Sequence, residues 1–85
     1  MDTHIKLRHA CHEAFLCFKK IGDSKNSEIQ SKLEFVVGSF DYDKNPAGLY
    51  EIGNIALKIL KEIKKKNPKK VDTKVIEDLE VSLKK

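Results

Sequence analysis

The side chains with the greatest chemical potential lie close together near the N-terminus, where three histidines, an arginine and a cysteine fall within nine residues. His9 and His12 are three residues apart, so on a helix both imidazoles can face the same way and share a metal ion. A zinc site needs three or four ligands, and Cys11 points about 100° or more away from both rings at the helical turn per residue. We therefore predict no metal site here. Because no buried partner that would tune either ring can be identified, we also predict no acid–base catalyst.

The two cysteines have a simpler interpretation. Cys11 and Cys17 both fall inside the apolar arc of one predicted helix, where free cysteine packs as a small hydrophobic residue. Two cysteines are too few for a disulfide framework, and six residues apart on one helix they cannot bridge. A reactive thiol needs exposure and a nearby positive charge, and the pattern offers neither. We predict that both cysteines serve packing.

An acidic turn in the middle of the chain resembles the start of a calcium loop only in part. Asp41, Asp43 and Asn45 have the spacing of the first three EF-hand ligands. That loop also needs a glycine at its sixth position and a glutamate at its twelfth, where this chain has Pro46 and Ile52. The pattern favours a turn stabilised by Asp and Asn side chains. Since no set of nucleophile, base and orienting group is legible elsewhere, we expect a protein without cofactor or catalytic activity.

The positive charge of the chain is concentrated in one lysine-rich stretch. Residues 58–74 contain eight lysines against two acidic residues, a balance of +6, while the other 68 residues sum to −2. Such a stretch can bind nucleic acid by neutralising phosphates. However, none of the cations is arginine, no aromatic residue is interleaved for base stacking, and lysines near a helix C-terminus are expected from the helix dipole. We favour a solvated face over a nucleic-acid site or an anionic membrane or protein partner. The lysines that would form the nucleic-acid patch are Lys58, Lys61, Lys65, Lys69 and Lys70, of which the first three share a helix face.

The elements that carry these residues all have helical periodicity. Gly22 favours a left-handed stop, Asn45 and Pro46 suit an N-cap and a first helical position, and Asp72 suits the N-cap of a last helix. We predict one all-α domain over residues 1–85, a compact four-helix arrangement with short loops. The helices are expected at approximately 3–20, 24–40, 46–66 and 72–83.

Each predicted helix has an apolar face that indicates the core. The third has the widest, extending past an arc of about 200°, which indicates packing on more than one side and a central position. The predicted core residues are Leu7, Ala10, Cys11, Ala14, Phe15, Cys17, Phe18 and Ile21; Ile29, Leu33, Val36, Val37 and Phe40; Tyr50, Leu49, Ile52, Ile55, Ala56, Leu57, Ile59, Leu60 and Ile63; and Val75, Ile76, Leu79 and Leu83.

A second stripe lies opposite the core arc of the first helix. Ile5, His9, His12 and Leu16 step by four, three and four residues, which matches a helix–helix seam. Phe35 leaves the core stripe of the second helix by about 100°. Another helix of the same chain, a second copy of the chain, or solvent can cover this stripe. If two copies meet there, the association should weaken as the pH falls through about 6.5, where histidine becomes charged.

These features favour an interaction protein. A core of 85 residues supplies only about 3–5 kcal/mol unless something assists it, and association is the aid the composition leaves open. We expect a cytoplasmic helical adaptor that associates with itself. A dimer is the favoured assembly, and the surface also leaves room for a protein partner. A nucleic-acid-binding module is the alternative. No run approaches the roughly 18 apolar residues of a membrane span.

Overall fold

The computed structural model describes residues 3–84, and within that range the chain forms four α-helices and no strand. The helices are α1 (Thr3–Ile21), α2 (Ser27–Asp43), α3 (Ala47–Lys66) and α4 (Thr73–Leu83). Short 3₁₀ turns precede α2 (Ser24–Asn26) and α4 (Pro68–Lys70). The predicted all-α arrangement of four helices with short loops is confirmed.

The breaks between helices follow local chemistry. Gly22 ends α1 with a φ of +69°, a conformation that glycine adopts without steric penalty. The Asp23 carboxylate accepts the backbone N–H of Lys25 at 2.9 Å, and the Asp72 carboxylate accepts that of Lys74 at 3.0 Å. Each capping side chain satisfies a backbone donor that would otherwise be left unpaired at a helix start.

The end of α2 differs from the prediction. The helix continues past Phe40 to Asp43, because the exposed Gly38 does not interrupt its hydrogen bonding. Lys44 then takes a left-handed conformation, with φ +62°, and its N–H donates to the Phe40 carbonyl at 2.7 Å. In the following turn the Asp43 carboxylate accepts the Asn45 N–H at 2.9 Å. The acidic residues therefore form the turn that the sequence favoured.

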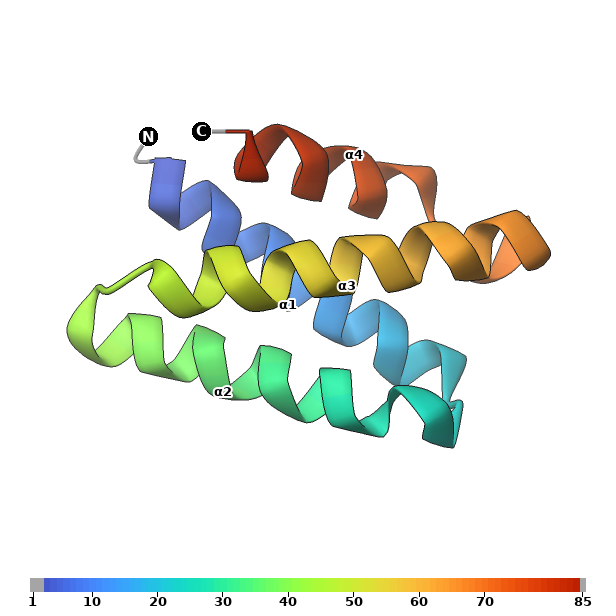
Figure 1. Cartoon of the computed structure of the whole chain (residues 1–85), viewed down its shortest axis with the longest axis horizontal. Coiled ribbons are helices and arrows are strands. Elements are labelled where there is room, and N and C mark those ends of the chain that lie inside the picture. The colour runs from blue at the N-terminus through green and yellow to red at the C-terminus, as the bar shows by residue number, and fades with distance from the viewer. Residues whose placement is uncertain (1–2, 85) are drawn as a thin grey trace.

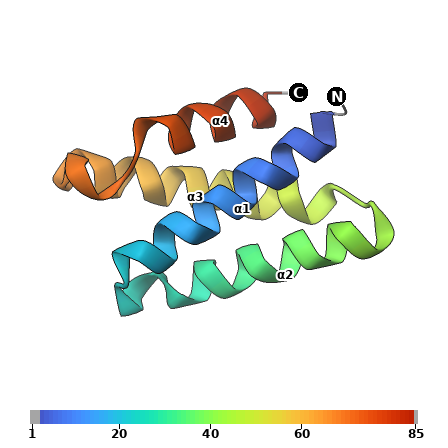
Figure 2. The same ribbon diagram turned by 180° about the vertical axis from the view of Figure 1, so that it is seen from behind.

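Two helices hold the centre of the bundle. α1 and α3 contact each other and both pack against α2 and α4, which flank them on opposite sides (Figures 1 and 2). α3 is thus central, as predicted, but it shares that position with α1. α1 crosses in front of α3 on one broad face of the molecule (Figure 2). The Cα extents of the bundle are 35 × 23 × 16 Å.

The core forms where the predicted apolar faces meet. Its largest completely buried side chains are Phe18, Leu7, Leu33, Leu49, Leu60 and Leu79. Ile55 is a correction, since it is 44% exposed at the edge of a shallow hollow between α2 and α3. Gly53, in contrast, is buried, and its lack of a side chain lets α1 and α4 approach α3 closely. A Cβ there would lie 3.2 Å from Leu83 Cδ2 and 3.4 Å from Cys11 Sγ.

Candidate functional site

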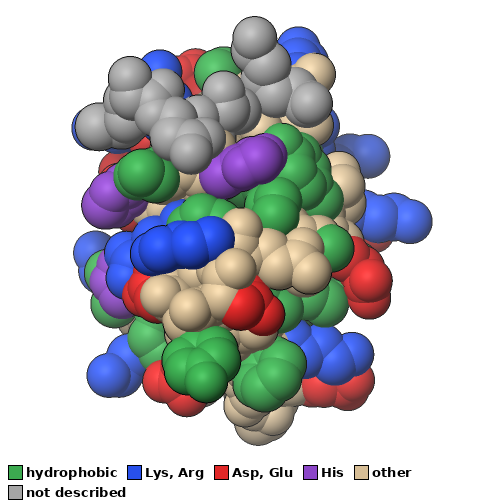
Figure 3. All heavy atoms as spheres, turned by 90° about the vertical axis from the view of Figure 1, so that its left-hand side faces the viewer, with side chains coloured by type: hydrophobic (Ala, Val, Ile, Leu, Met, Phe, Trp, Pro, Cys, Tyr) green, Lys and Arg blue, Asp and Glu red, His purple; other side chains and the backbone are tan. Residues whose placement is uncertain are grey.

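The second stripe of α1 is left uncovered by the fold. Ile5, His9, His12 and Leu16 are all exposed, with Leu16 at 48%. No other helix in the described range lies over them, so the interpretation that the chain covers its own stripe is wrong. The stripe lies on the side of α1 that faces away from α3 and the core. Figure 3 shows histidine and hydrophobic side chains next to one another on the surface at one end of the bundle.

An ion pair sets the register between α1 and α2 beside this stripe. Arg8 donates two hydrogen bonds to Asp41, from Nε to Oδ1 at 3.0 Å and from Nη2 to Oδ2 at 2.8 Å. These hydrogen bonds lower the pKa of Asp41, and the positive charges of Arg8 and Lys44 and the nearby His12 act in the same direction. A bidentate pair between planar groups has a defined geometry. It therefore orients the two helices more than it stabilises them.

The outer face of α2 exposes two aromatic rings. Phe35 is 74% exposed and Tyr42 is 92% exposed. They are seven residues apart and therefore share a helix face. Between them lies Gly38, where an added Cβ would meet no atom within 4 Å, so the surface there is open. The position of Phe35 outside the core was predicted from its departure from the core stripe, whereas the exposure of Tyr42 was not predicted. The seven-residue spacing from Phe35 was the signal that could have found it.

The position of Phe35 is close to the α1 stripe along the helix axes. α1 and α2 run in opposite directions (Figure 2), and Asp41 pairs with Arg8. Phe35 is six residues before Asp41, a rise of about 9 Å, and Leu16 is eight residues after Arg8, a rise of about 12 Å. The two apolar side chains therefore lie at nearly the same level on neighbouring helices, but they do not share a side of the bundle. Phe35 is about 120° around α2 from Asp41, which faces α1. It shares a helix face with Glu28, which borders the hollow between α2 and α3.

The structure divides the predicted lysine patch between two places. Lys58, Lys61 and Lys65 are exposed on α3, but Lys61 pairs with Glu80 of α4 at 3.3 Å. Lys69 and Lys70 belong to the 3₁₀ turn before α4 and line a cleft against α1 instead. Because one of the α3 lysines is engaged with a carboxylate and the last two lysines border a different element, the five residues do not form one continuous anion-binding face.

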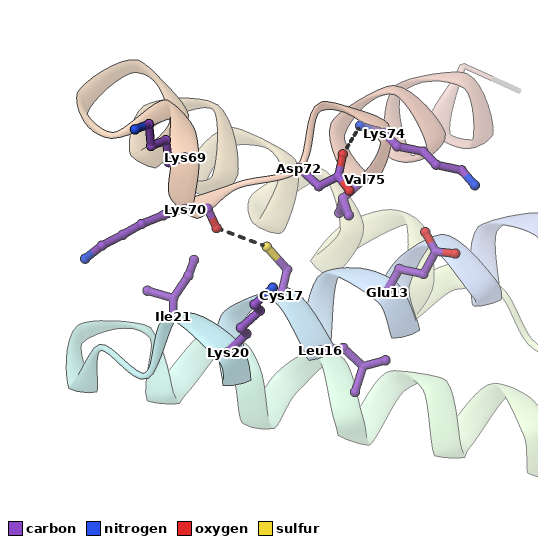
Figure 4. Close-up of a pocket in the computed structure, with 10 residues that line it drawn as sticks. All are labelled: Glu13, Leu16, Cys17, Lys20, Ile21, Lys69, Lys70, Asp72, Lys74 and Val75. Atoms are coloured by element: carbon purple, nitrogen blue, oxygen red, sulfur yellow. Dashed lines mark hydrogen bonds between the residues drawn. The ribbon is translucent and has the colours of Figure 1, made fainter.

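That cleft has a volume of about 750 Å³. α1 forms one wall, and the 3₁₀ turn and the start of α4 form the other (Figure 4). Its lining residues are Glu13, Leu16, Cys17, Lys20 and Ile21 from α1, and Lys69, Lys70, Asp72, Lys74 and Val75 from the second wall. The sequence did not indicate this site, because its two walls are more than 45 residues apart in the chain.

Cys17 lies in the middle of the cleft. Its thiol makes a weak hydrogen bond of 3.9 Å to the Lys70 carbonyl across the gap (Figure 4). Partial burial raises the pKa of Cys17, and the positive charge of Lys20 opposes that effect only in part. Cys11, fully buried against Leu49, has a pKa raised to about 12 by desolvation. Both thiols are therefore protonated at neutral pH and weak nucleophiles.

The described residues contain no cluster that could hold a metal ion. Among them, no three His, Cys, Asp or Glu side chains converge on a point where an ion would sit. His12 stacks on Phe15 with ring centroids 6.2 Å apart, and His4 contacts the edge of the Tyr50 ring. His4 and His12 thus contact aromatic side chains, and no described histidine belongs to a possible metal-ligand cluster.

No helix of the described chain is long and apolar enough to cross a membrane. Comparison with protein-family models, with curated proteins and with solved structures found no match to this chain. The functional proposal therefore depends on the geometry of the exposed surfaces alone.

Proposed function

We propose that this protein is a self-associating helical adaptor that acts in the cytoplasm, and that two copies meet through the outer faces of α1 and α2. The observations that carry the proposal are the uncovered stripe of α1 and the exposed Phe35 and Tyr42 of α2. Large exposed apolar side chains that lie together on one face of a helix, as Phe35 and Tyr42 do, mark interaction surfaces more often than scattered ones do.

The dimensions of the molecule suit such an interface. α1 lies on a broad face of the bundle (Figure 2), and the Cα extents along that face are 35 and 23 Å. A standard protein interface buries about 800 Å² on each partner, so an interface of that size would extend beyond the α1 stripe over much of this face. Burying a Phe side chain contributes about 1.5–3 kcal/mol, so Phe35 and Leu16 together are worth several kcal/mol of association.

The spacing on α1 favours a second copy as the occupant. Steps of four, three and four residues allow side chains of one helix to enter the gaps of another, and a two-fold axis across the stripe would set each α1 against the other. The imidazoles of His9 and His12 would then lie within the seam. Their charging would oppose association, so the dimer should weaken between pH 8 and pH 5.5.

The test is the mass in solution, measured by light scattering and by sedimentation over a range of concentrations. The wild-type chain should have about twice the 9.7 kDa mass of one copy. Phe35→Glu and Leu16→Glu should each shift it to the monomer mass without loss of helicity in circular dichroism. A wild-type protein that stays monomeric up to hundreds of micromolar would overturn the proposal.

A matched control is available on α4. Val81 is 67% exposed on a helix that packs against α1 and α3, so Val81→Glu makes the same apolar-to-acidic change away from the proposed seam. It should leave the dimer intact. Equal disruption by Val81→Glu would show that added charge, and not loss of the α1–α2 contact, separates the copies.

Nucleic-acid binding remains the alternative proposal, and it has a separate readout. It requires salt-dependent binding of duplex DNA or RNA that is abolished by charge reversal at Lys58, Lys61 and Lys65 while the mass is unchanged. The division of the predicted patch and the Lys61–Glu80 pair give it less support than self-association has. No binding at tens of micromolar in low salt would eliminate it.

A further inference from the structure

The cleft between α1 and the start of α4 has an apolar surface along its length. Leu16 and Ile21 of α1 and Val75 of α4 line it on both sides of Cys17 (Figure 4). Its volume of about 750 Å³ falls within the range of about 300–1,000 Å³ that is typical of small-molecule sites. The hollow thus has the size and the lining of a ligand site, and the residues that decide its specificity are the charged ones at its rim.

Three of the four lysines that line this cleft lie toward one end or in its middle. Lys69 and Lys70 lie with Ile21 at that end, Lys20 lies beside Cys17, and Glu13 and Lys74 lie at the opposite end (Figure 4). The proximity of Lys20 is also shown by its lowering effect on the pKa of the Cys17 thiol.

The acidic residue nearest the lysines is already engaged. Asp72 accepts the Lys74 backbone N–H at 3.0 Å and caps α4. This hydrogen bond holds the carboxylate at the start of α4.

The three lysines at this end have no protein partner, unlike Lys61 and Lys64 nearby. Lys61 pairs with Glu80, and Lys64 donates to Thr73 Oγ1 at 2.6 Å and to the Val71 carbonyl at 3.3 Å. Within the described residues, Lys20, Lys69 and Lys70 form no ion pair and no side-chain hydrogen bond. Their ammonium groups are free to bind an anion.

We propose that this cleft binds a small amphipathic anion, a carboxylate or phosphate head on a short hydrocarbon chain. The head would accept hydrogen bonds from Lys20 and from the lysines of the 3₁₀ turn, as ammonium groups bind anionic oxygens. The hydrocarbon chain would lie against Leu16 and Val75. The cleft shares Leu16 with the proposed seam, but its specificity rests on lysines that are not part of that seam, so charge reversal at these lysines tests ligand binding separately from self-association.

Titration calorimetry with decanoate and decyl phosphate, below their micelle concentrations, tests the proposal. Both should bind, whereas acetate, which lacks the chain, and decyltrimethylammonium, which has the opposite charge, should bind at least about tenfold more weakly. The double variant Lys20→Glu/Lys70→Glu should weaken decanoate binding at least about tenfold, the loss of a charge-assisted hydrogen bond. Lys58→Glu/Lys65→Glu makes the same change in net charge on α3 and should leave the affinity unchanged.

Cys17 supplies a second readout within the cleft. A maleimide should label Cys17 in the folded protein and not the fully buried Cys11, and decanoate should slow that labelling severalfold. Equal affinity for the cationic amphiphile, equal weakening by the α3 control, or labelling that decanoate does not slow would each overturn the proposal. Binding to vesicles of anionic phospholipid without binding to monomeric decanoate would also overturn it, in favour of a membrane surface.

Discussion

Two glycines inside helices provide a sharp test of the packing, because the structure gives them opposite surroundings. Gly38 lies on the open face of α2, where an added Cβ meets nothing within 4 Å. Gly53 of α3 is buried, and its added Cβ would lie 3.2 Å from Leu83 Cδ2, 3.4 Å from Cys11 Sγ and 3.8 Å from Leu7 Cδ1. The perturbation is the same at both sites, glycine to alanine.

The expected magnitudes follow from these distances. Alanine is favoured over glycine within a helix by about 0.8–1.0 kcal/mol. At Gly38 nothing opposes that gain, so Gly38→Ala should raise the free energy of unfolding by about 0.5–1 kcal/mol and the Tm by several degrees. At Gly53 the gain is opposed by overpacking, which costs about 1–3 kcal/mol. Leu83 can move at the end of α4, but Cys11 and Leu7 are completely buried. Gly53→Ala should therefore be less stable than the wild type, by up to about 2 kcal/mol.

Urea unfolding followed by circular dichroism measures both changes. Low protein concentration is needed so that self-association does not add to the stability of the folded state. If Gly53→Ala were as stable as Gly38→Ala, α1 and α4 would not approach α3 as closely as the structure shows. If Gly38→Ala were destabilising at low concentration, the outer face of α2 would not be open.

Two further predictions concern the α1 terminus and the α1–α2 ion pair. Gly22→Ala should lower the free energy of unfolding by about 1–2 kcal/mol, because an L-residue is strained at φ +69°; an unchanged urea midpoint would contradict the left-handed end of α1. Arg8→Gln should return the lowered pKa of Asp41 toward its ordinary value of about 3.9, measured by NMR titration of the carboxyl carbon. Since the folded-state pKa is the lower one, the contribution of the pair to stability is present above about pH 3.9 and is lost as the pH falls through the folded-state pKa. An Asp41 pKa that is the same in both proteins would show that the pair does not form in solution.

Much of the fold could be predicted from the sequence because helix formation is encoded locally. Gly22 and Asp72 act within a few residues of their own positions, and each places a helix boundary through its own backbone or side-chain chemistry. Core faces are also local, since a 3.6-residue period needs only one helix to be seen. The second stripe of α1 was predicted by the same periodicity, and the structure leaves it exposed.

The features that the sequence did not reveal all depend on how the helices meet. The lysines of residues 58–74 follow one another in the chain, yet Lys61 contacts α4 and Lys70 borders α1. Ile55 belongs to a predicted core arc but lies at an edge that no neighbour covers completely. A charge or an apolar side chain can be assigned to a helix face from sequence, but what that face contacts is decided by the crossing of two helices.

The sequence by itself therefore determined that this chain is a bundle of four helices, where the chain breaks between them, and which stripe of α1 lies opposite its core face. Only the tertiary structure decided that α1 and α3 share the centre of the bundle and that α1 and α4 approach α3 at Gly53. It also decided that Cys17 and Lys70 face each other across a cleft. The physical reason is the separation of the interacting residues along the chain. Hydrogen-bonded caps and helical periodicity act over a few residues, whereas a cleft requires contacts between segments that are far apart in the sequence.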